Sequence, residues 1–243
     1  GLGVFEAAPA LIERYGDKVA IALIGPSGEM RLRAAGIQNL DKDGLPSRIA
    51  ARGGLGALMA SKGIKAIVID GASGEKPPIA DLPAFRRAQK DYNKALQAHP
   101  QTKIYTDFGT AAMVNMCNSF GGLPTRNFSS GRFEDAELVS GELIRDQQLA
   151  RAANPNSECE ISHACMAGCT IRSSNIYGGP DGKMLVSPLE YETIGLMGPN
   201  LGINDLDTIA RLNWEVNNLG LDSIEIGCAL GVAAEAGLMA WGD

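Results

Sequence analysis

The spacing of apolar residues divides the chain into a shorter part rich in strands and a longer part rich in helices. Apolar residues recur at a helical spacing over 4–15 and stop at Gly16, which predicts a helix with a glycine end. Short apolar runs at 18–24 and 66–69 predict strands, the second of them buried, and the pattern over 29–37 predicts another strand. The first part of the chain is therefore expected to be β-rich.

A segment rich in proline and glycine, DGASGEKPPIA at 70–80, separates the two parts. It can continue neither a helix nor a sheet, so we place a domain boundary there, between residues 1–72 and residues 80–243. Residues 155–177, which hold three cysteines, are predicted to be irregular. The fold class is α+β, with a β-rich domain followed by a mostly α-helical domain. Helices are expected over 81–98, 108–120, 133–153, near 190–197, from the capping residue Asn204 to Gly220, and over 222–239.

Composition and charge argue against several classes of protein. A hydrophobic content of 45% is enough for a packed core, which excludes a disordered chain. The 28 acidic residues outnumber the 22 basic ones and leave a net charge of −6, which is unfavourable for binding nucleic acid. No apolar run reaches the roughly 18 residues of a membrane span. No cationic leader precedes an apolar run, so we expect a cytoplasmic protein that does not enter membranes.

A glycine-rich segment at 48–62 has the composition of an anion-binding bend. Glycines at 53, 54 and 56 allow backbone N–H groups to approach a ligand closely, and Arg52 adds a planar cation. The segment matches neither the P-loop nor the dinucleotide-binding fingerprint. Two interpretations therefore stay open: a site for a phosphate-type ligand, or a tight helix entrance whose glycines serve packing.

Three of the five cysteines lie close together, at Cys159, Cys165 and Cys169. Thiols at this spacing, in a loop that contains a glycine, can converge on one metal centre, and an intracellular setting favours an iron–sulfur cluster over a disulfide. A cubane cluster takes four ligands, so these three form an incomplete set. His163 lies among them and is a candidate ligand, although a surface or hydrogen-bonding histidine is the more common interpretation.

Two glutamates, Glu190 and Glu192, stand at the predicted start of a helix. Taken alone, they are best explained as solvated charges that favour the positive end of that helix. A buried carboxyl at this place would instead have a raised pKa and could exchange protons near a reactive centre.

Five segments together resemble the tungsten-dependent aldehyde:ferredoxin oxidoreductase family. They follow one another in family order along nearly the whole chain: RGGLGALMASKGIKAIVIDG (52–71), GGLPTRNFSSGRFEDAELVSGE (121–142), CEISHACMAGCTIRSSN (159–175), EYETIGLMGPNLGI (190–203) and NNLGLDSIEIG (217–227). Members of the family are longer than this chain. The resemblance therefore implies that these residues are the middle of a longer protein: the end of a β-rich, pterin-cradling domain and most of a first helical domain.

The resemblance also implies a cofactor and a reaction. The cofactor would be tungsten or molybdenum held by two pterins, with a Mg²⁺ ion bridging the pterin phosphates and a [4Fe–4S] cluster nearby. The enzyme would oxidise a small aldehyde to a carboxylic acid and pass the electrons through the cluster to ferredoxin. Its assembly would be a homodimer or would include an iron–sulfur partner subunit.

The same segments imply which residues form the site. Glu192 would lie beside the metal and accept the proton lost as water or hydroxide adds to the aldehyde carbon. Cys159, Cys165 and Cys169 would bind the cluster, with Ser162 where the family has a cysteine. The cofactor-binding residues would be Arg48, Ala50, Ala51, Arg52, Gly53, Gly54, Leu221, Asp222 and Asn217, the last standing where the family has an aspartate.

Two other readings of the sequence stay open. The same scaffold can run reductively, as in aryl-CoA reductase subunits. Alternatively, the chain is a non-catalytic fragment or scaffold that lacks the complete cofactor site, with a cysteine loop that is a structural element or an electron-relay interface.

Overall fold

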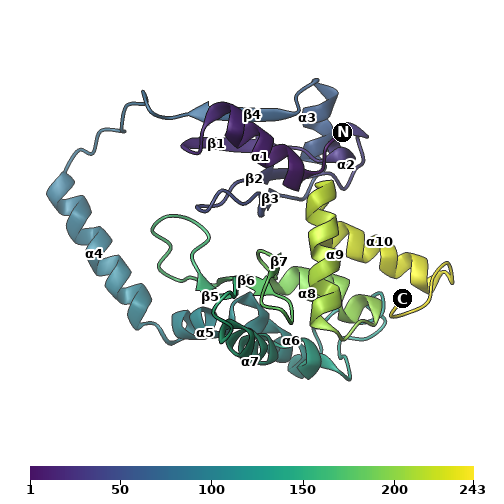
Figure 1. The fold of residues 1–243 in the computed structure, drawn as a ribbon. Helices are drawn as coiled ribbons and strands as arrows, with labels where there is room; N and C mark the ends of the chain where they lie inside the picture. The colour runs from purple at the N-terminus through teal and green to yellow at the C-terminus, as the bar shows by residue number, and fades with distance from the viewer.

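The computed structural model describes residues 1–243 and shows two parts joined by an extended segment (Figure 1). The first part is an antiparallel sheet with the strand order β3-β2-β1-β4. Helix α1 packs against this sheet through a small core formed by Val4, Ala7 and Ala8 with Ile21 and Leu23. The elements of this part are α1 (Val4–Tyr15), β1 (Val19–Leu23), α2 (Pro26–Glu29), β2 (Ile37–Asn39), β3 (Arg48–Ala50), α3 (Leu55–Ser61) and β4 (Ala66–Asp70).

Strand β4 forms one edge of the sheet and has one face exposed. Its side chains alternate between the two faces, as in any strand. Ala66 and Val68 pack against the small core under α1, whereas Ile67 and Ile69 are 46% and 60% exposed. The prediction of a strand at 66–69 is confirmed, but the prediction that it is buried is wrong, because only one of its faces has a partner.

The segment between β1 and β2 differs from the expected strand over 29–37. Residues 26–29 form the short helix α2, and β2 begins only at Ile37. The backbone between them pairs with the second part of the molecule instead of with the sheet. The N–H of Asp222 donates to the carbonyl of Ala34 (2.9 Å), and the N–H of Gly36 donates to the carbonyl of Gly220 (2.9 Å).

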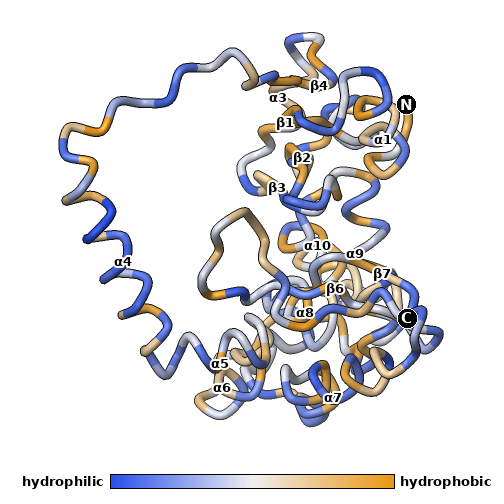
Figure 2. The backbone as a smooth tube through the Cα atoms, turned by 60° about the vertical axis from the view of Figure 1, so that its left-hand side comes forward, coloured by the Kyte–Doolittle hydropathy of each residue, from blue (hydrophilic) through white to orange (hydrophobic).

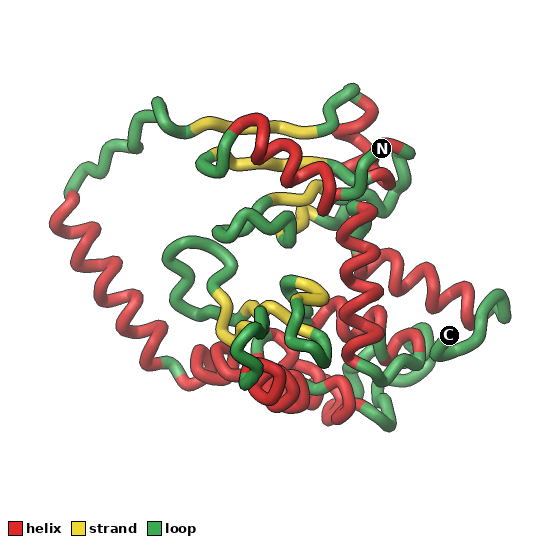
Figure 3. The backbone as a smooth tube through the Cα atoms, in the orientation of Figure 1, coloured by secondary structure: helices red, strands yellow, loops and turns green.

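The second part is mostly helical and is built around a core cluster of 20 buried residues. A small antiparallel sheet with the order β5-β6-β7 lies within it (Figure 3). No helix of the structure has the length and apolar character that a bilayer crossing demands. The elements are α4 (Leu82–Ala98), α5 (Pro100–Phe108), η1 (Thr110–Ala112), α6 (Met113–Phe120), η2 (Ala136–Val139), α7 (Gly141–Ala152), β5 (Glu160–His163), β6 (Ser174–Gly178), β7 (Met184–Val186), α8 (Tyr191–Met197), η3 (Pro199–Leu201), α9 (Leu206–Leu219) and α10 (Ser223–Glu235).

Helix α4 follows the segment at 71–81 and stands apart from the sheet (Figure 1). It has no buried residue, and apolar and polar residues alternate along it (Figure 2). Its amphipathic sequence predicts the helix correctly, because helical periodicity is local information. Periodicity does not show what the exposed apolar face of α4 contacts, because such contacts depend on the tertiary structure.

Three expectations for the helical part are corrected. The helix expected over 108–120 is interrupted at Gly109, whose φ of 63° ends α5 before η1 and α6 begin. The helix expected over 133–153 is shortened to η2 and α7. The cysteine segment is not wholly irregular, because residues 160–163 form β5 and residues 174–177 begin β6, two short strands that pair with each other.

Helix α9 connects the two parts of the molecule. The ring of its Trp214 stacks on Phe5 of α1 at a centroid distance of 5.3 Å. The side-chain oxygen of Asn218, one turn further along α9, accepts a hydrogen bond from the N–H of Phe5 (3.1 Å). The left-handed end of α9 at Gly220 is confirmed, with φ 74°.

The cap of α9 is Asp205 and not the predicted Asn204. The Asp205 carboxylate accepts a hydrogen bond from the N–H of Thr208 (2.8 Å), whereas Asn204 donates to Asp135 (2.8 Å). We expect Asp205→Ala to lower the free energy of unfolding of the full-length protein by about 1 kcal/mol, the usual value of an N-cap. Asn204→Ala is the matched control and should have a smaller effect. Urea unfolding followed by circular dichroism measures both, and a larger loss with Asn204→Ala would contradict the assignment.

Candidate functional site

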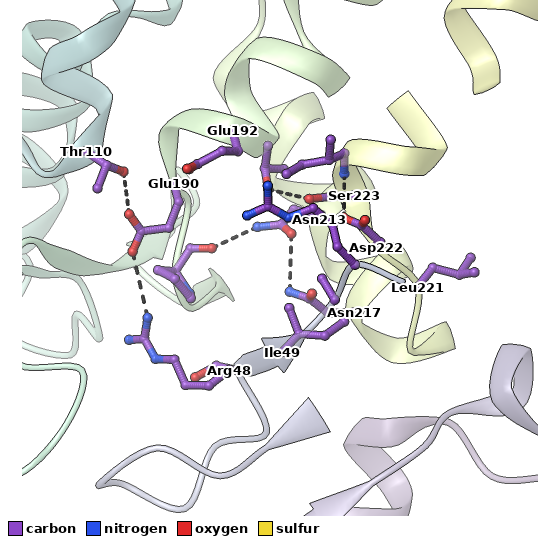
Figure 4. A pocket seen from close by; sticks show the side chains of 16 residues that line it. Arg48, Ile49, Thr110, Glu190, Glu192, Asn213, Asn217, Leu221, Asp222 and Ser223 are labelled. Carbon is purple, nitrogen blue, oxygen red and sulfur yellow. Dashed lines mark hydrogen bonds and ion pairs between the residues drawn. The ribbon is translucent and has the colours of Figure 1, made fainter. Parts of the chain in front are cut away.

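A cavity of about 480 Å³ lies where the end of the first sheet meets helices α8, α9 and α10 (Figure 4). Strand β3 and the residues after it form one wall, and the starts of α8 and α10 with the inner face of α9 form the other. The lining residues are Ser47, Arg48, Ile49, Ala51, Arg52, Thr110, Pro188, Glu190, Glu192, Thr193, Asn213, Asn217, Leu221, Asp222, Ser223 and Ile224.

Arg48 reaches from β3 toward the second part of the molecule. Its guanidinium donates a hydrogen bond to the hydroxyl of Ser174 (2.7 Å) and lies 3.8 Å from a carboxylate oxygen of Glu190. The Nε atom of Arg48 is buried and makes no hydrogen bond. Because a buried cationic N–H group without a partner is costly, this atom is available to an acceptor that enters the cavity.

The carboxylate of Glu190 is fixed from both sides. The hydroxyl of Thr110 donates to one of its oxygens, and Thr110 also accepts a hydrogen bond from the N–H of Tyr191 (2.9 Å). Burial raises the pKa of Glu190, although Thr110 and the charge of Arg48 act in the opposite direction. Glu190 is thus the more enclosed of the two glutamates that line the cavity.

Glu192 lines the same cavity but its side chain is exposed. Figure 4 shows Glu190 and Glu192 projecting from the start of α8 toward the same space. The family resemblance implied a catalytic role for Glu192 and none for Glu190. Glu190 could have been found from its position, because it stands two residues before Glu192 at the start of the same helix. A cation such as Arg48 in another segment is the kind of partner that a buried carboxylate needs.

The wall formed by α9 and α10 carries amides and one capping carboxylate. Asn217 donates to the side-chain oxygen of Asn213 (3.2 Å), and Asn213 donates to the carbonyl of Pro188 (2.8 Å). Asp222 caps α10, where its carboxylate accepts a hydrogen bond from the N–H of Ile224 (3.0 Å). Asn213 was not predicted, but its position four residues before Asn217 places both on one face of a helix.

The glycine-rich bend has two sides with different roles. Gly54 and Gly56 pack against backbone, since a Cβ atom would lie 2.8 Å from the carbonyl oxygen of Arg33 at Gly54 and 2.3 Å from that of Gly36 at Gly56. Gly53 has φ 91° and open space beside it. The N–H groups of Arg52, Gly53 and Gly54 donate no hydrogen bond within the protein. Packing explains two of the glycines, and the free N–H groups leave the bend open to an anion.

The residues expected to bind the cofactor divide into two groups. Six of them line the cavity, namely Arg48, Ala51, Arg52, Asn217, Leu221 and Asp222. The other three, Ala50, Gly53 and Gly54, do not line it. Ala50 pairs with Ile37 inside the sheet, and Gly54 faces the backbone of Arg33.

The structure brings two of the three clustered cysteines together. Burial raises the pKa of Cys165, and its neighbour Cys169 adds to the increase. Burial alone would raise the pKa of Cys169 as well, but hydrogen bonds from the N–H of Arg172 (3.3 Å) and from Cys165 hold it below its ordinary value. The two thiols therefore form a pair in which Cys169 is the better thiolate.

Cys159 does not join this pair. Its sulfur lies 3.8 Å from the carbonyl oxygen of Gly182, in the turn between β6 and β7, and the three thiols do not gather at one point. Ser162 is also turned elsewhere, because its hydroxyl donates to the carbonyl of Thr106 (2.6 Å). Cys159 precedes β5 and lies beside the β6–β7 turn, whereas Cys165 and Cys169 follow β5. This position does not favour Cys159 as a third ligand.

The cavity has the donor set of a site for an anionic, hydrogen-bonding ligand. Arg48 and Arg52 are suited to phosphate oxygens, and the amides of α9 can both donate and accept. The free N–H groups of Gly53 and Gly54 lie at the bend that follows Arg52, next to the cavity lining but not part of it. Arg48 also connects the cavity to the cysteine loop, because it donates to Ser174 (2.7 Å), the first residue of the strand that follows the loop, and its positive charge offsets part of the rise in the pKa of Cys165. These groups fit a phosphate-bearing pterin. The pair of thiols is half of the ligand set of a cubane cluster.

Comparison with known proteins agrees with this geometry. A family model for the aldehyde ferredoxin oxidoreductase N-terminal domain matches residues 1–71, and a second, for domains 2 and 3 of aldehyde ferredoxin oxidoreductase, matches residues 87–239. Tungsten-containing aldehyde ferredoxin oxidoreductases of Thermococcus kodakarensis and Pyrococcus abyssi are each 37% identical to this chain. The matches cover 97% of the chain and 36% of the first protein, and 96% of the chain and 35% of the second.

Two further proteins are more distant. An aliphatic sulfonate oxidoreductase, WOR-like subunit, of Pyrococcus furiosus is 30% identical over 89% of the chain and 32% of its own length. The active-site complex BamBC of benzoyl coenzyme A reductase matches in structure with a TM-score of 0.67 at 20% identity, over 98% of this chain and 36% of that chain. The chain spans about a third of the length of the relatives it matches. It belongs to the aldehyde ferredoxin oxidoreductase family.

Proposed function

We propose that the full-length protein oxidises an aldehyde to a carboxylic acid at a tungsten or molybdenum bis-pterin centre. The observation that carries the proposal is the cavity at the junction of β3, α8, α9 and α10. Six of the residues expected to bind the cofactor line it together with Glu192, although they come from three distant segments of the sequence. The names of the relatives support the reaction class.

The wall beside β3 would hold the cofactor through its phosphates. Arg52 and the unpartnered N–H groups at residues 52–54 offer charge and hydrogen bonds on one side, and the free Nε of Arg48 offers another donor. A Mg²⁺ ion bound with the phosphates would neutralise part of their charge. The amides of Asn213 and Asn217 would face the ring system from the opposite wall. When bound, the metal centre supplies the two-electron chemistry that side chains cannot perform.

The two glutamates would have separate roles. Glu192, exposed to the cavity, would accept the proton released as water adds to the aldehyde carbon. Glu190 is held by Thr110 and lies beside Arg48, so it would orient that guanidinium instead of exchanging protons with substrate. The different burial of two neighbouring carboxyls is a common way of assigning different roles to them.

The cysteine loop would carry the electrons away. Cys165 and Cys169 would be two of the four ligands of a [4Fe–4S] cluster, and ferredoxin would be the acceptor. The described residues offer no third thiol at this place, since Cys159 contacts the β6–β7 turn. The set would therefore need two ligands besides this pair. The loop extends from the helical part toward the sheet, as Figures 1 and 3 show. Arg48 donates to Ser174, the first residue of β6, which follows the loop.

The proposal is tested on the full-length protein. Tungsten, molybdenum and iron contents are measured, and viologen reduction is followed with a series of aldehydes. We expect tungsten or molybdenum together with iron, and reduction that depends on the aldehyde. Oxidation of reduced viologen by an aryl-CoA ester, with no response to aldehydes, would instead support a reductive enzyme. A protein with no tungsten or molybdenum would be a scaffold, and the proposal would be wrong.

A single substitution tests the role of the bend. Arg52→Ala in the full-length protein should lower the retained pterin and metal about tenfold, because one charge-assisted hydrogen bond of roughly 1.5 kcal/mol is lost. Metal analysis after gel filtration measures the loss. Arg132→Ala, an exposed arginine that does not line the cavity, is the matched control and should retain the metal. Equal metal contents in the two variants would exclude Arg52 from the binding site.

A further inference from the structure

A cluster of ionisable side chains outside the cavity joins the two parts of the molecule. The loop between β2 and β3 carries Asp41 and Asp43, and the last residue of β5 is His163. One ligand atom from each of these three side chains lies within 4.8 Å of the others. His163 lies more than 100 positions from the two aspartates in the sequence, so only the tertiary fold brings it to them.

His163 is the centre of this cluster. Its side chain is 0% exposed, and its Nδ1 atom lies 2.8 Å from a carboxylate oxygen of Glu160. Its Nε2 atom makes no hydrogen bond. Asp43 and Asp41 place oxygens 3.1 Å and 3.9 Å from Nε2, the nearer one without hydrogen-bond geometry. The expectation of a hydrogen-bonding histidine is confirmed at Nδ1, and that of a surface histidine is wrong, because the side chain is buried. Neither expectation accounts for Nε2, which lies between two carboxylates.

The two aspartates are held differently. Asp41 is buried, and its oxygens accept hydrogen bonds from the N–H groups of Asp43 (2.8 Å) and Leu45 (3.0 Å) and from the hydroxyl of Ser47 (3.0 Å). Its carboxylate is therefore fixed in place before any ligand arrives. Asp43 is exposed and pairs with Lys42, whose ammonium lies 2.8 and 2.7 Å from its two oxygens. Lys42 thus occupies the outer side of the cluster as a monovalent counter-ion.

We propose that Asp41, Asp43 and His163 bind one divalent transition-metal ion. Ligand atoms around such an ion, with bonds of about 2.1 Å, are separated by roughly 3–3.5 Å. The distance of 3.1 Å from Nε2 to Asp43 lies within this range, and the distance of 3.9 Å to Asp41 lies slightly above it. A ring nitrogen with carboxylate oxygens suits Zn²⁺, Fe²⁺ or Mn²⁺ better than Ca²⁺ or Mg²⁺. Glu160 completes the arrangement, because a metal-binding histidine usually gives its other N–H to a carboxylate.

The charge of the cluster agrees with a divalent occupant. Asp41, Asp43 and Glu160 bring three carboxylates to one imidazole. The cations near them are Lys42 and Arg172, and a guanidinium nitrogen of Arg172 lies 3.7 Å from Glu160. A metal ion at Nε2 would balance the remaining charge and replace Lys42 at Asp43. It would also link the β2–β3 loop to β5, the strand that leads into the cysteine loop. The metal ion would thus fix the position of the two parts of the chain relative to each other beside Cys165 and Cys169.

The test uses Mn²⁺ as the probe, because Mn²⁺ prefers nitrogen and oxygen ligands to thiolates. Full-length protein, freed of loosely bound cations by gel filtration, is titrated with Mn²⁺, and free Mn²⁺ is counted by its electron paramagnetic resonance signal at room temperature. We expect wild-type protein to bind one ion more than His163→Gln. Glu160→Gln should lower the affinity for that ion about tenfold or more, because the carboxylate that holds the other ring nitrogen of His163 is lost.

Two exposed positions make the result independent of folding defects. Asp43→Asn should weaken the Mn²⁺ site, and Lys42→Gln should strengthen it, because the competing ammonium is gone. Asp146→Asn, an exposed aspartate on α7, should bind as the wild type does. Tungsten content and circular dichroism confirm that each variant is folded. If His163→Gln binds as many ions as wild type, or if neither Asp43→Asn nor Lys42→Gln changes the affinity, the cluster is an ion pair and the proposal is wrong.

Discussion

Replacing Glu192 by glutamine in the full-length protein is expected to lower aldehyde-dependent turnover by about a hundredfold to ten thousandfold, the usual contribution of a positioned general base. Glutamine keeps the shape and polarity of the side chain but cannot accept the proton. Because Glu192 lines the cavity without an ion-pair partner, its loss should leave the cofactor in place. Turnover with a saturating aldehyde and the tungsten content of the same preparation give the two readouts.

Glu225→Gln is the matched control for this experiment. Glu225 is an exposed glutamate in the first turn of α10, near the cavity but not part of its lining. Its variant should turn over like the wild type. Glu190→Gln gives a useful contrast, since we expect it to disturb Arg48 and so reduce the cofactor content together with the rate. Normal turnover in Glu192→Gln would remove Glu192 from the mechanism and leave Glu190 as the remaining carboxyl of the cavity.

A large loss of stability is expected from Asp207→Asn. Asp207 on α9 receives two hydrogen bonds from Arg151 of α7 (2.7 and 2.9 Å) and one from the hydroxyl of Tyr177 (2.7 Å). Arg151 and Asp207 are only 14% and 16% exposed, so the variant leaves a largely buried guanidinium without its counter-ion. We expect a loss of about 2 kcal/mol, below the 3–5 kcal/mol of a fully buried pair because some solvent reaches both groups. Urea unfolding of the full-length protein at neutral pH measures it.

The same pair predicts a pH dependence. Burial alone would raise the pKa of Asp207, but the hydrogen bonds from Arg151 and Tyr177 outweigh it and lower the pKa below its ordinary value. A carboxyl with a lowered pKa contributes stability that is fully present above its ordinary pKa of about 3.9 and is lost as the pH falls through the folded value. The difference between wild type and Asp207→Asn should therefore be the same at pH 7 and pH 5 and shrink only below pH 4. Asp146→Asn, at an exposed pair, should show no measurable difference.

Local sequence patterns determined most of the helices and the ends of several of them. The apolar stripe of α1, the amphipathic face of α4 and the glycine that ends α9 each act within a few residues, so they can be read from one segment at a time. The same locality explains the errors. Residues 30–36 have a strand-like pattern, but their backbone bonds to the junction of α9 and α10, which no local pattern records.

The sequence by itself also determined the family, through five segments in order, and with it seven of the sixteen residues that line the cavity. Only the tertiary structure decided how those residues are used. It placed Glu190, and not only Glu192, in the cavity beside Arg48, it moved Cys159 away from the thiol pair, and it enclosed His163 between two aspartates from another part of the chain. The physical reason is that burial, pairing and orphaned hydrogen-bond groups arise when distant segments pack together, whereas residue type and spacing describe each segment alone.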